Sequence, residues 1–404
     1  MTTGRAKQFQ LYRRIALFAL ALAAASGVLL RFGLYRGFPA WAQNFGAVRH
    51  AHSHLMYFGW VTLGLMALIW ADLPRYVERP LPRAVSWQMA ATAIASLISF
   101  PAFWLNGYGL TAVGSADLPL GSMTAALNGL TWYFFIFLYW QMTRHMVDKP
   151  LPIRLWDVAV ALMALSSLGA VGLAALVVAD RNSFVLQQLF LHLFQDLFAL
   201  GWFTLALLGV LWAQYGSVLA TRVHLPVAAL GLALVPTFLL GMSPVVVTPA
   251  LFWVAAVANV IAALMLARHL WALWQTGAAL SALERFALLC LALHVATAFV
   301  LIWPGFWRWA HGTQLRIFYL HNFLLGWISS GLLGVLLLDL RKQRHRLWQI
   351  IAVLWIGGVS LMLLALLGLG FAARRPLSPL FLLRSAAWSS VFPAAAATLA
   401  FIAS

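Results

Sequence analysis

Charged side chains are scarce in this sequence. Of 404 residues, 9% are charged, with 26 Lys and Arg against 9 Asp and Glu, whereas 64% are hydrophobic. Because water-soluble globular domains carry about 25% charged residues, the composition excludes a soluble fold and predicts that lipid surrounds the chain. Cys290 is the single cysteine, which excludes an intrachain disulfide and a cluster of thiolate ligands.

Long apolar runs recur along the whole chain, each near the roughly 20 residues that a helix needs to cross a bilayer. Their short connections predict one all-α membrane domain over residues 1–404. The first run follows a basic segment, so a cleaved signal peptide is an alternative there, but the run continues to Leu30 without a polar flank. We expect about twelve membrane-spanning helices, near residues 15–31, 52–71, 85–105, 120–142, 155–179, 184–213, 224–243, 248–270, 283–303, 315–338, 347–371 and 385–403.

Lysine and arginine concentrate in alternate connections of this helix order, including residues 5–14, 75–83, 144–154 and 341–346. Cytoplasmic loops of membrane proteins carry the excess of basic residues. We therefore expect a cytoplasmic N-terminus and a multi-pass protein of a bacterial-type inner (plasma) membrane. The net charge of +17 then reflects topology and attraction to anionic lipid headgroups, and it does not predict nucleic-acid binding.

A short motif recurs in three of the expected helices. Residues 54–66 read HLMYFGWVTLGLM and residues 321–333 read HNFLLGWISSGLL, so both have His, four residues and then Gly-Trp. Residues 196–209 read DLFALGWFTLALLG, which places Asp196 where the other two have histidine. The second, sixth and tenth helices thus share a motif at a spacing of four helices. This spacing predicts three four-helix units about a pseudo-threefold axis, roughly residues 1–142, 150–270 and 283–404.

Ionisable residues gather at the expected outer ends of the same three helices. An aspartate within a membrane helix costs about 2.5–3.5 kcal/mol on insertion scales, which predicts a partner or a function for Asp196. His192 and Asp196 are four residues apart and share one helix face, as do His50 and His54. Imidazole and carboxylate groups bind iron and copper, so we expect a metal site among these residues. The alternative for any single histidine is a hydrogen-bonded core residue or an interfacial anchor.

Twelve helices, pseudo-threefold units and histidines near the outer face of helices two, six and ten resemble the catalytic subunit of heme-copper oxidases and nitric-oxide reductases. Residues 50–59, HAHSHLMYFG, also resemble the NnrS family of that broader group. The resemblance covers most of the chain as architecture, whereas its sequence motifs are confined to these few helices. It implies a b-type heme membrane protein in electron transfer or in nitric-oxide or respiratory metabolism.

The resemblance also implies residue roles. His54 and His321 match the two axial ligands of a low-spin heme b. The family places two arginines against the heme propionates, where this chain has Arg374 and Arg375, and a guanidinium fork suits a carboxylate. The alternative for these arginines is an interfacial position at the membrane surface. Other residues expected beside the cofactor are Trp60, Trp327 and Tyr319. The candidate metal ligands are His54, His321, His50, His52, His192 and Asp196.

The sequence departs from this family at the catalytic centre. The oxidases carry His-x-His on the tenth helix, where this chain has Tyr319 and His321, and His-x-x-x-Tyr on the sixth, where it has His192 and Asp196. The two adjacent copper-binding histidines of the seventh helix are absent, since residues 241–244 read GMSP. We therefore expect a degenerate heme-copper centre that keeps the low-spin heme. Whether the chain also binds a second heme, iron or copper ion is left undecided by the sequence.

Two hypotheses from other classes stand beside this one. Proline residues around the seventh expected helix, Pro236, Pro244 and Pro249, together with the polar stripe of the sixth, fit a transporter of an ion or small solute with broken helices. The chain could also be an assembly partner of a respiratory complex. Under the heme hypothesis its partners are membrane lipid and a redox partner or another respiratory subunit. An absorbance spectrum separates the heme hypothesis from the other two.

Overall fold

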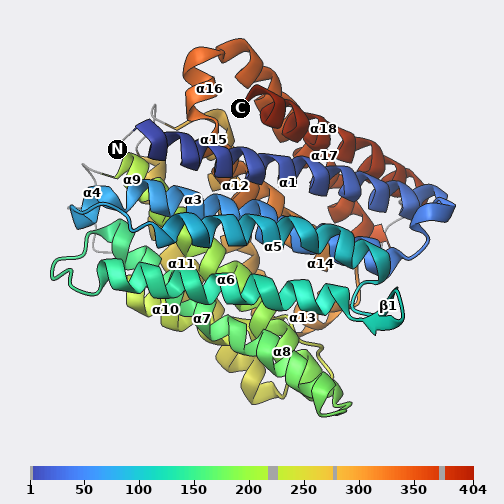
Figure 1. Ribbon diagram of the computed structural model, residues 1–404. Helices are drawn as coiled ribbons and strands as arrows, with labels where there is room; N and C mark the ends of the chain where they lie inside the picture. The colour runs from blue at the N-terminus through green and yellow to red at the C-terminus, as the bar shows by residue number, and fades with distance from the viewer. Residues whose placement is uncertain (1–2, 217–225, 276–279, 373–377) are drawn as a thin grey trace. The chain divides into compact units, whose positions relative to one another are not determined.

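The computed structural model describes residues 3–216, 226–275, 280–372 and 378–404, and most of them are helical (Figure 1). Helices form here because backbone groups in hydrocarbon must find their partners within the segment itself. The chain is a multi-pass, all-α integral membrane protein. Within the described residues, ten helices are long and apolar enough to cross a membrane: Phe9–Arg36, Phe45–Val77, Ala84–Asn106, Leu151–Val178, Phe184–Tyr215, Pro249–Trp274, Ala282–Leu301, Leu315–Leu336, His345–Phe371 and Pro379–Ala403.

The chain forms two compact units. Unit 1 comprises Met1–Met146 and Leu332–Ser404, and unit 2 comprises Val147–Gly331. The boundaries of three repeat units, which the motif spacing predicts, stay a prediction.

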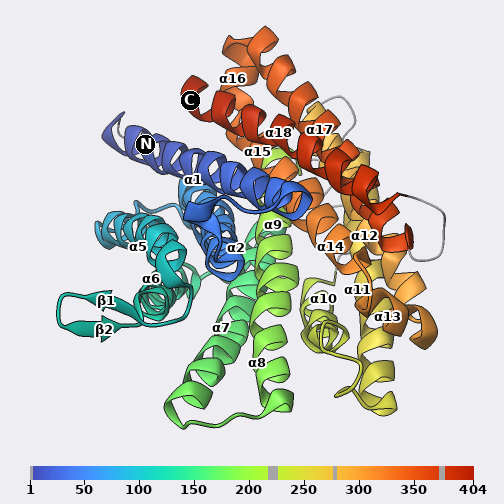
Figure 2. The ribbon, with the colours of Figure 1, turned by 90° about the vertical axis from the view of Figure 1, so that its right-hand side faces the viewer.

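Unit 1 contains the first helices and the last two long ones. Helix α5 packs along α6, and α18 packs against both α1 and α17 (Figures 1 and 2). A two-stranded antiparallel hairpin, β1 and β2, connects α5 to α6. The elements of this unit are α1 (Thr3–Arg36), η1 (Ala40–Ala42), α2 (Phe45–His54), η2 (Leu55–Thr62), α3 (Leu63–Asp72), α4 (Pro74–Val77), α5 (Ala84–Asn106), β1 (Thr111–Val113), β2 (Ala116–Leu118), α6 (Leu120–Thr143), α16 (Leu338–Gln343), α17 (His345–Phe371) and α18 (Pro379–Ala403).

Unit 2 contains the middle of the chain. Helix α7 packs along α8 and α9, and α11 packs along α12. Its elements are α7 (Leu151–Val178), α8 (Phe184–Leu197), η3 (Phe198–Phe203), α9 (Thr204–Tyr215), α10 (Val227–Leu234), η4 (Val235–Leu240), α11 (Pro249–Trp274), α12 (Ala282–Leu301), α13 (Pro304–His311), α14 (Leu315–His321) and η6 (Asn322–Ser329), and α15 (Ser330–Leu336) continues η6 across the boundary between the units.

Two of the twelve expected spans differ from the ten long apolar helices. Helix α6 has 24 residues but carries polar side chains such as Asn128, whose Oδ1 accepts a hydrogen bond from Ser96 of α5 at 3.0 Å. The segment Val227–Leu240 has 8 residues of α-helix and 6 of 3-10 helix around Pro236. At about 1.5 and 2.0 Å per residue it spans roughly 24 Å, less than the roughly 30 Å of a hydrocarbon core. The count of twelve spans is therefore not confirmed.

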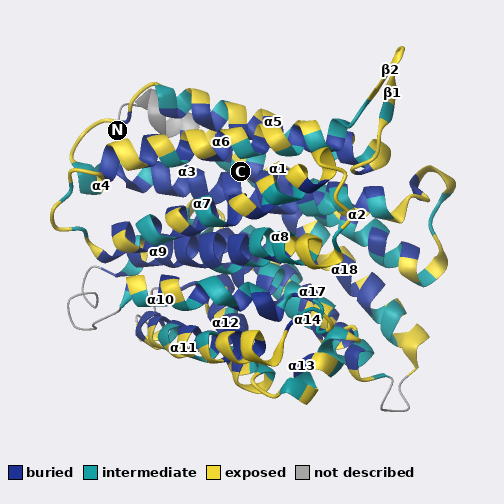
Figure 3. Ribbon diagram, turned by 90° about the horizontal axis from the view of Figure 1, so that it is seen from below, coloured by how far each residue is buried: buried dark blue, intermediate teal, exposed yellow. Residues whose placement is uncertain are grey.

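The helices that carry the Gly-Trp motif are the most buried of the ten. Their most apolar stretches are 94%, 83% and 72% buried for Phe45–Val77, Phe184–Tyr215 and Leu315–Leu336, whereas the other seven reach 50% at most. Figure 3 shows this as dark blue along α3 and α9. A helix that is apolar all round is typical of the interior of a membrane bundle. The motif therefore marks interior helices.

Candidate functional site

The Gly-Trp motif has the same local structure in all three helices. In each one the α-helix changes to a π-helix over the motif, in η2 (Leu55–Thr62), η3 (Phe198–Phe203) and η6 (Asn322–Ser329). The π-helix makes up well under 1% of residues in globular proteins and is frequent at functional sites. Since a sequence repeat and a rare conformation coincide three times, these helices share a structural motif.

The glycine of each motif packs closely against the long helix that precedes it in the chain. A Cβ atom added to Gly59, Gly201 or Gly326 would meet a side chain of that helix at 3.0 Å or less. The neighbouring helices are α1, α7 and α12, and the residues that contact the three glycines are, in the same order, Ala19, Leu162 and Cys290. Small residues allow such close approach of helices in membranes. The repeat therefore includes a helix pair as well as a single helix.

The tryptophans of the three motifs, Trp60, Trp202 and Trp327, have no exposed surface. The Nε1 atom of Trp327 has no hydrogen-bond partner among the described residues. Trp60 and Trp327, which the sequence predicts beside a cofactor, are therefore core residues of the protein, and their role toward a cofactor stays a prediction.

His54 is the last residue of α2 and directly precedes η2. It is buried, its Nε2 atom lies 2.9 Å from the hydroxyl of Tyr108, and its ring stacks on Phe103 with ring centroids 3.8 Å apart. The other ring nitrogen, Nδ1, is buried without a hydrogen-bond partner among the described residues. An unpaired buried polar group costs about 1–3 kcal/mol. The imidazole is therefore held firmly while its hydrogen bonding is incomplete.

His50 and His52 lie on the same helix but have different neighbours. The ring of His50 contacts Tyr108 with centroids 4.9 Å apart. His52 faces α1, where its Nδ1–H donates to the carbonyl of Ala23 at 2.8 Å. Residues two apart on a helix point to different sides, whereas residues four apart share a face. The structure thus brings His50 and His54 together around Tyr108 and separates His52 from both.

His321 is the last residue of α14 and directly precedes η6, so it has the position of His54 in its own helix. Its Nδ1 atom lies 2.8 Å from the carbonyl oxygen of Ile317. Since a carbonyl only accepts, Nδ1 carries the proton, and in the neutral imidazole Nε2 holds the lone pair. A bond from Nδ1–H to a backbone carbonyl is the usual arrangement that orients a metal-ligating histidine.

Tyr319 joins two helices of unit 2. Its hydroxyl lies 3.3 Å from Nε2 of His294 in α12. Nδ1 of His294 is buried and has no hydrogen-bond partner in the described part of the chain. Next to this contact, Asn322 at the start of η6 donates to the carbonyl of Cys290 at 3.1 Å. Tyr319 and His294 therefore form a buried polar contact between α12 and α14.

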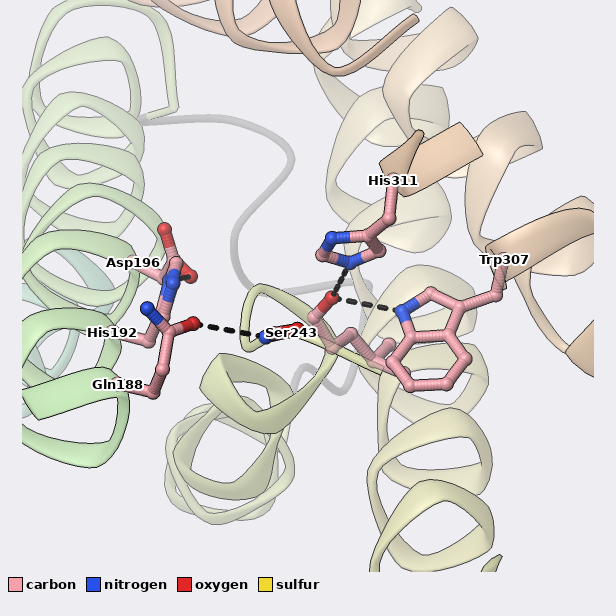
Figure 4. Close-up of polar contacts among 7 residues, drawn as sticks. Gln188, His192, Asp196, Ser243, Trp307 and His311 are labelled. Carbon is pink, nitrogen blue, oxygen red and sulfur yellow. Dashed lines mark hydrogen bonds and ion pairs between the residues drawn. The ribbon is translucent and has the colours of Figure 1, made fainter. Parts of the chain in front are cut away.

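Asp196 has the partner that its place in a membrane helix predicts. The Nδ1–H of His192 donates to Oδ2 of Asp196 at 2.7 Å within α8, and His192 is buried (Figure 4). One turn earlier, Oε1 of Gln188 accepts the backbone N–H of Ser243 at 2.9 Å. The prediction that Asp196 has a partner is confirmed, and the partner is His192. The polar stripe of α8 faces the loop that follows η4.

This loop lies directly against the His–Asp pair. A Cβ atom added to Gly241 would overlap the carboxylate of the pair, so any larger residue there must displace that carboxylate. The carbonyl of Leu240 accepts two hydrogen bonds, from Nε1 of Trp307 at 2.9 Å and from Nε2 of His311 at 2.8 Å, as Figure 4 shows. The loop is therefore tied to α8 on one side and to α13 on the other.

His311 lies outside the membrane-spanning helices and close to several charged groups. Burial lowers the pKa of its imidazole below the usual 6.5, and Arg316 and His192 act in the same direction. The hydrogen bond to the Leu240 carbonyl and the charge of Asp196 oppose this shift in pKa. The neutral form of His311 is therefore favoured in the folded protein.

The described residues contain no group of three or more His, Cys, Asp or Glu side chains that could hold a metal ion. The predicted metal site that combines His50 with His192 and Asp196 therefore gains no support from the geometry. A heme that is held by two imidazoles needs no such group. The arginines predicted against its propionates, Arg374 and Arg375, lie outside the described residues.

Sequence reasoning missed two residues that the geometry brings forward. Tyr108 follows a helix end in the sequence, where a tyrosine is typical of the aromatic belt at a membrane interface, so no local signal marks its contact with His54. Gly241 stands in a segment that was expected to be part of a membrane helix, and its contact with Asp196 depends on where that helix breaks.

The chain matches no model of a known protein family, and no curated protein matches it. The fold and the contacts described above define a class: a polytopic α-helical membrane protein with three Gly-Trp π-helices and a histidine directly before two of them.

Proposed function

We propose that this protein binds a b-type heme in the membrane, with His54 and His321 as its two axial ligands. The observation that carries the proposal is their shared position, because each is the last α-helical residue before a Gly-Trp π-helix. Two histidines that the sequence repeat makes equivalent therefore also occupy equivalent places in local structure.

The state of each imidazole supports iron binding. The bond from Nδ1–H of His321 to the Ile317 carbonyl leaves the lone pair on Nε2, the nitrogen that a metal needs. His54 is buried and held in place by Phe103, and its Nε2 atom contacts only the hydroxyl of Tyr108 among the hydrogen bonds that the structure records, so a metal at this nitrogen would take the place of that one hydroxyl. When bound between two imidazoles, a heme supplies one-electron transfer and has no open iron position for oxygen.

The remaining expectations from the resemblance belong to this proposal. Trp60, Trp327 and Tyr319 line the cofactor, and Arg374 and Arg375 bind its propionates. The protein then is a divergent, NnrS-like member of the heme-copper oxidase and nitric-oxide reductase superfamily, with a degenerate catalytic centre. It acts in electron transfer or in nitric-oxide or respiratory metabolism, together with a redox partner or another respiratory subunit.

We also propose a bacterial-type inner membrane and a cytoplasmic N-terminus. The support is the concentration of arginine and lysine in alternate connections. Cysteine labelling of His145→Cys in right-side-out vesicles tests this orientation, because His145 is exposed in the connection after α6. Protection from an impermeant maleimide is expected, and labelling in intact vesicles would reverse the orientation.

A second candidate function has its own observation. The broken helix Val227–Leu240 ends directly against the His192–Asp196 pair. Discontinuous helices that end at buried polar groups are typical of ion-coupled transporters. A transporter of an ion or small solute is therefore the alternative, and it predicts a colourless purified protein.

The absorbance spectrum of the purified protein tests the proposal. We expect a Soret band, and sharp α bands after reduction. His54→Ala and His321→Ala are each expected to abolish the low-spin spectrum, whereas His145→Ala is the matched control and is expected to leave it intact. Normal heme content in both His54→Ala and His321→Ala would refute the ligand assignment, and a colourless wild-type protein would refute the heme itself.

A further inference from the structure

The hydroxyl of Tyr108 lies in the way of any ligand for His54. The Nε2 atom of His54 lies 2.9 Å from the hydroxyl oxygen of Tyr108, within hydrogen-bond distance. The stacking of the imidazole on Phe103, with centroids 3.8 Å apart and planes 26° apart, fixes the direction of this nitrogen. The other nitrogen, Nδ1, is buried inside the protein. A ligand therefore reaches His54 at Nε2, where Tyr108 is now bound.

The backbone holds Tyr108 in this place. Helix α5 ends at Asn106, and Gly107 follows with φ +60° and ψ −126°, a conformation that side chains other than glycine rarely adopt. This turn brings the Tyr108 ring back over the end of α2, where it also contacts His50 with centroids 4.9 Å apart. The placement of Tyr108 over the imidazole thus depends on a glycine that directly precedes it.

Tyr108 can leave without disturbing the core. Half of its surface, 51%, is exposed, whereas His54 is 8% exposed. Its hydroxyl makes one hydrogen bond that the structure records, to His54. Release of Tyr108 therefore costs one hydrogen bond and three ring contacts, with His50, His54 and Phe103.

We propose that Tyr108 is a latch: its hydroxyl occupies the Nε2 atom of His54 and must be displaced before a metal, such as the iron of a cofactor, binds at this nitrogen. The identity of that ligand as heme rests on the function proposed above, whereas the latch itself does not. At His321, by contrast, the recorded hydrogen bond is that of the Nδ1–H, which donates to the Ile317 carbonyl. The two histidines thus differ, because a backbone carbonyl orients the ring of His321 whereas Tyr108 occupies the Nε2 atom of His54.

Chemical footprinting of the heme-free protein tests the latch without any cofactor. Diethyl pyrocarbonate reacts with unprotonated ring nitrogens of histidine, and mass spectrometry of the modified peptide resolves His54 from its neighbours. Loss of one hydrogen bond of ordinary strength corresponds to about a tenfold change, so Tyr108→Phe is expected to raise the rate at His54 about tenfold and Tyr108→Ala further. His52, which is bonded to the Ala23 carbonyl on another side of the helix, is the internal reference.

A hemin titration gives a second test, in which the latch and a purely structural role of Tyr108 predict changes of affinity in opposite directions. The latch predicts that Tyr108→Phe binds hemin about tenfold more tightly than wild type, while its thermal stability is unchanged or lower. Tyr35→Phe, at the end of α1, is the matched control. A residue that merely supports the fold would lower both stability and affinity when changed.

The outcomes separate the two proposals. An unchanged footprint at His54 in both Tyr108 variants overturns the latch, as does weaker hemin binding in Tyr108→Phe. A faster footprint with no hemin binding by any variant supports the latch and refutes the heme. If Tyr108→Ala does not fold, Tyr108→Phe decides the question, since it keeps the ring and its contacts.

Discussion

The imidazole of His192 and the carboxylate of Asp196 form a hydrogen bond of 2.7 Å across one turn of α8. This hydrogen bond offsets part of the free-energy cost of placing an aspartate in a membrane helix, which is high without a partner. The loop at Gly241 lies against the carboxylate and leaves no room for a side chain. An interaction within one helix thus also fixes where the broken helix Val227–Leu240 can end.

Removing the partner of His192 is expected to destabilise unit 2. Asp196→Leu leaves the Nδ1–H of a buried imidazole unpaired, which costs about 1–3 kcal/mol of unfolding free energy. Asp196→Asn keeps an acceptor oxygen and is expected to cost less. Denaturant unfolding in detergent micelles measures both, and Asp148→Leu, at an exposed position, is the control. An equal loss for Asp196→Leu and Asp148→Leu would contradict the importance of the pair.

A methyl group at position 241 is expected to be more harmful than one at position 305, which also lies in unit 2. Gly241→Ala must push the Asp196 carboxylate away, so we expect an overpacking cost of about 1–3 kcal/mol. Gly305 has no atom within 4 Å of an added Cβ, and Gly305→Ala is therefore the matched control. Thermal melts of the two variants give the comparison. A smaller shift for Gly241→Ala than for Gly305→Ala would mean that the loop moves freely.

Much of this architecture follows from the sequence. Runs of apolar residues predict the ten long helices, and comparison of helices with one another identifies the Gly-Trp motif that contains Gly59, Gly201 and Gly326. The pairing of His192 with Asp196 follows from spacing, since residues four apart on a helix are neighbours. These features depend on local periodicity, which a single sequence contains.

Contacts between distant segments could not be predicted in the same way. Tyr108 is 54 residues from His54, and its contact depends on a turn at Gly107. The helix expected at 224–243 is shortened because Pro236 has no backbone N–H to continue the α-helical pattern, and the chain instead forms the 3-10 helix η4. The change from α-helix to π-helix over Gly-Trp also has no sequence signal of its own. Each depends on packing against another helix.

Acidification is expected to weaken unit 2 through His311. Its pKa in the folded protein is lowered from 6.5, first by burial. Above pH 6.5 both folded and unfolded forms are neutral, so the contribution of His311 to stability is complete. As the pH falls below 6.5, the unfolded form binds the proton first, and stability is lost progressively down to the folded pKa. Melting temperatures at pH 7.5 and pH 5 measure the effect.

His311→Gln serves as the matched variant for this pH dependence. Its side-chain amide can still donate to the Leu240 carbonyl but does not titrate. We expect a smaller loss of stability between pH 7.5 and pH 5 than in the wild type. The same loss in both proteins would assign the acid sensitivity to other groups.

The register of the π-helix η6 is expected to decide where His321 points. Successive residues of an α-helix are about 100° apart around the helix axis. Leu325 lies within η6. If its deletion makes this segment α-helical, the residues before it rotate by about 100° around the axis relative to those after it. His321 then leaves its direction relative to the rest of the helix. The low-spin heme spectrum is therefore expected to disappear in this deletion variant.

A packing change without a register change provides the control for this last prediction. Gly326→Val adds a side chain where Sγ of Cys290 lies 2.6 Å from an added Cβ, so it is expected to cost about 1–3 kcal/mol of stability. It deletes no residue, and His321 keeps its direction, so the low-spin spectrum is expected to persist. Gly357→Val, with open space at its Cβ, is expected to change neither. If the Leu325 deletion folds and keeps a normal low-spin spectrum, the π-helix has no part in aiming His321.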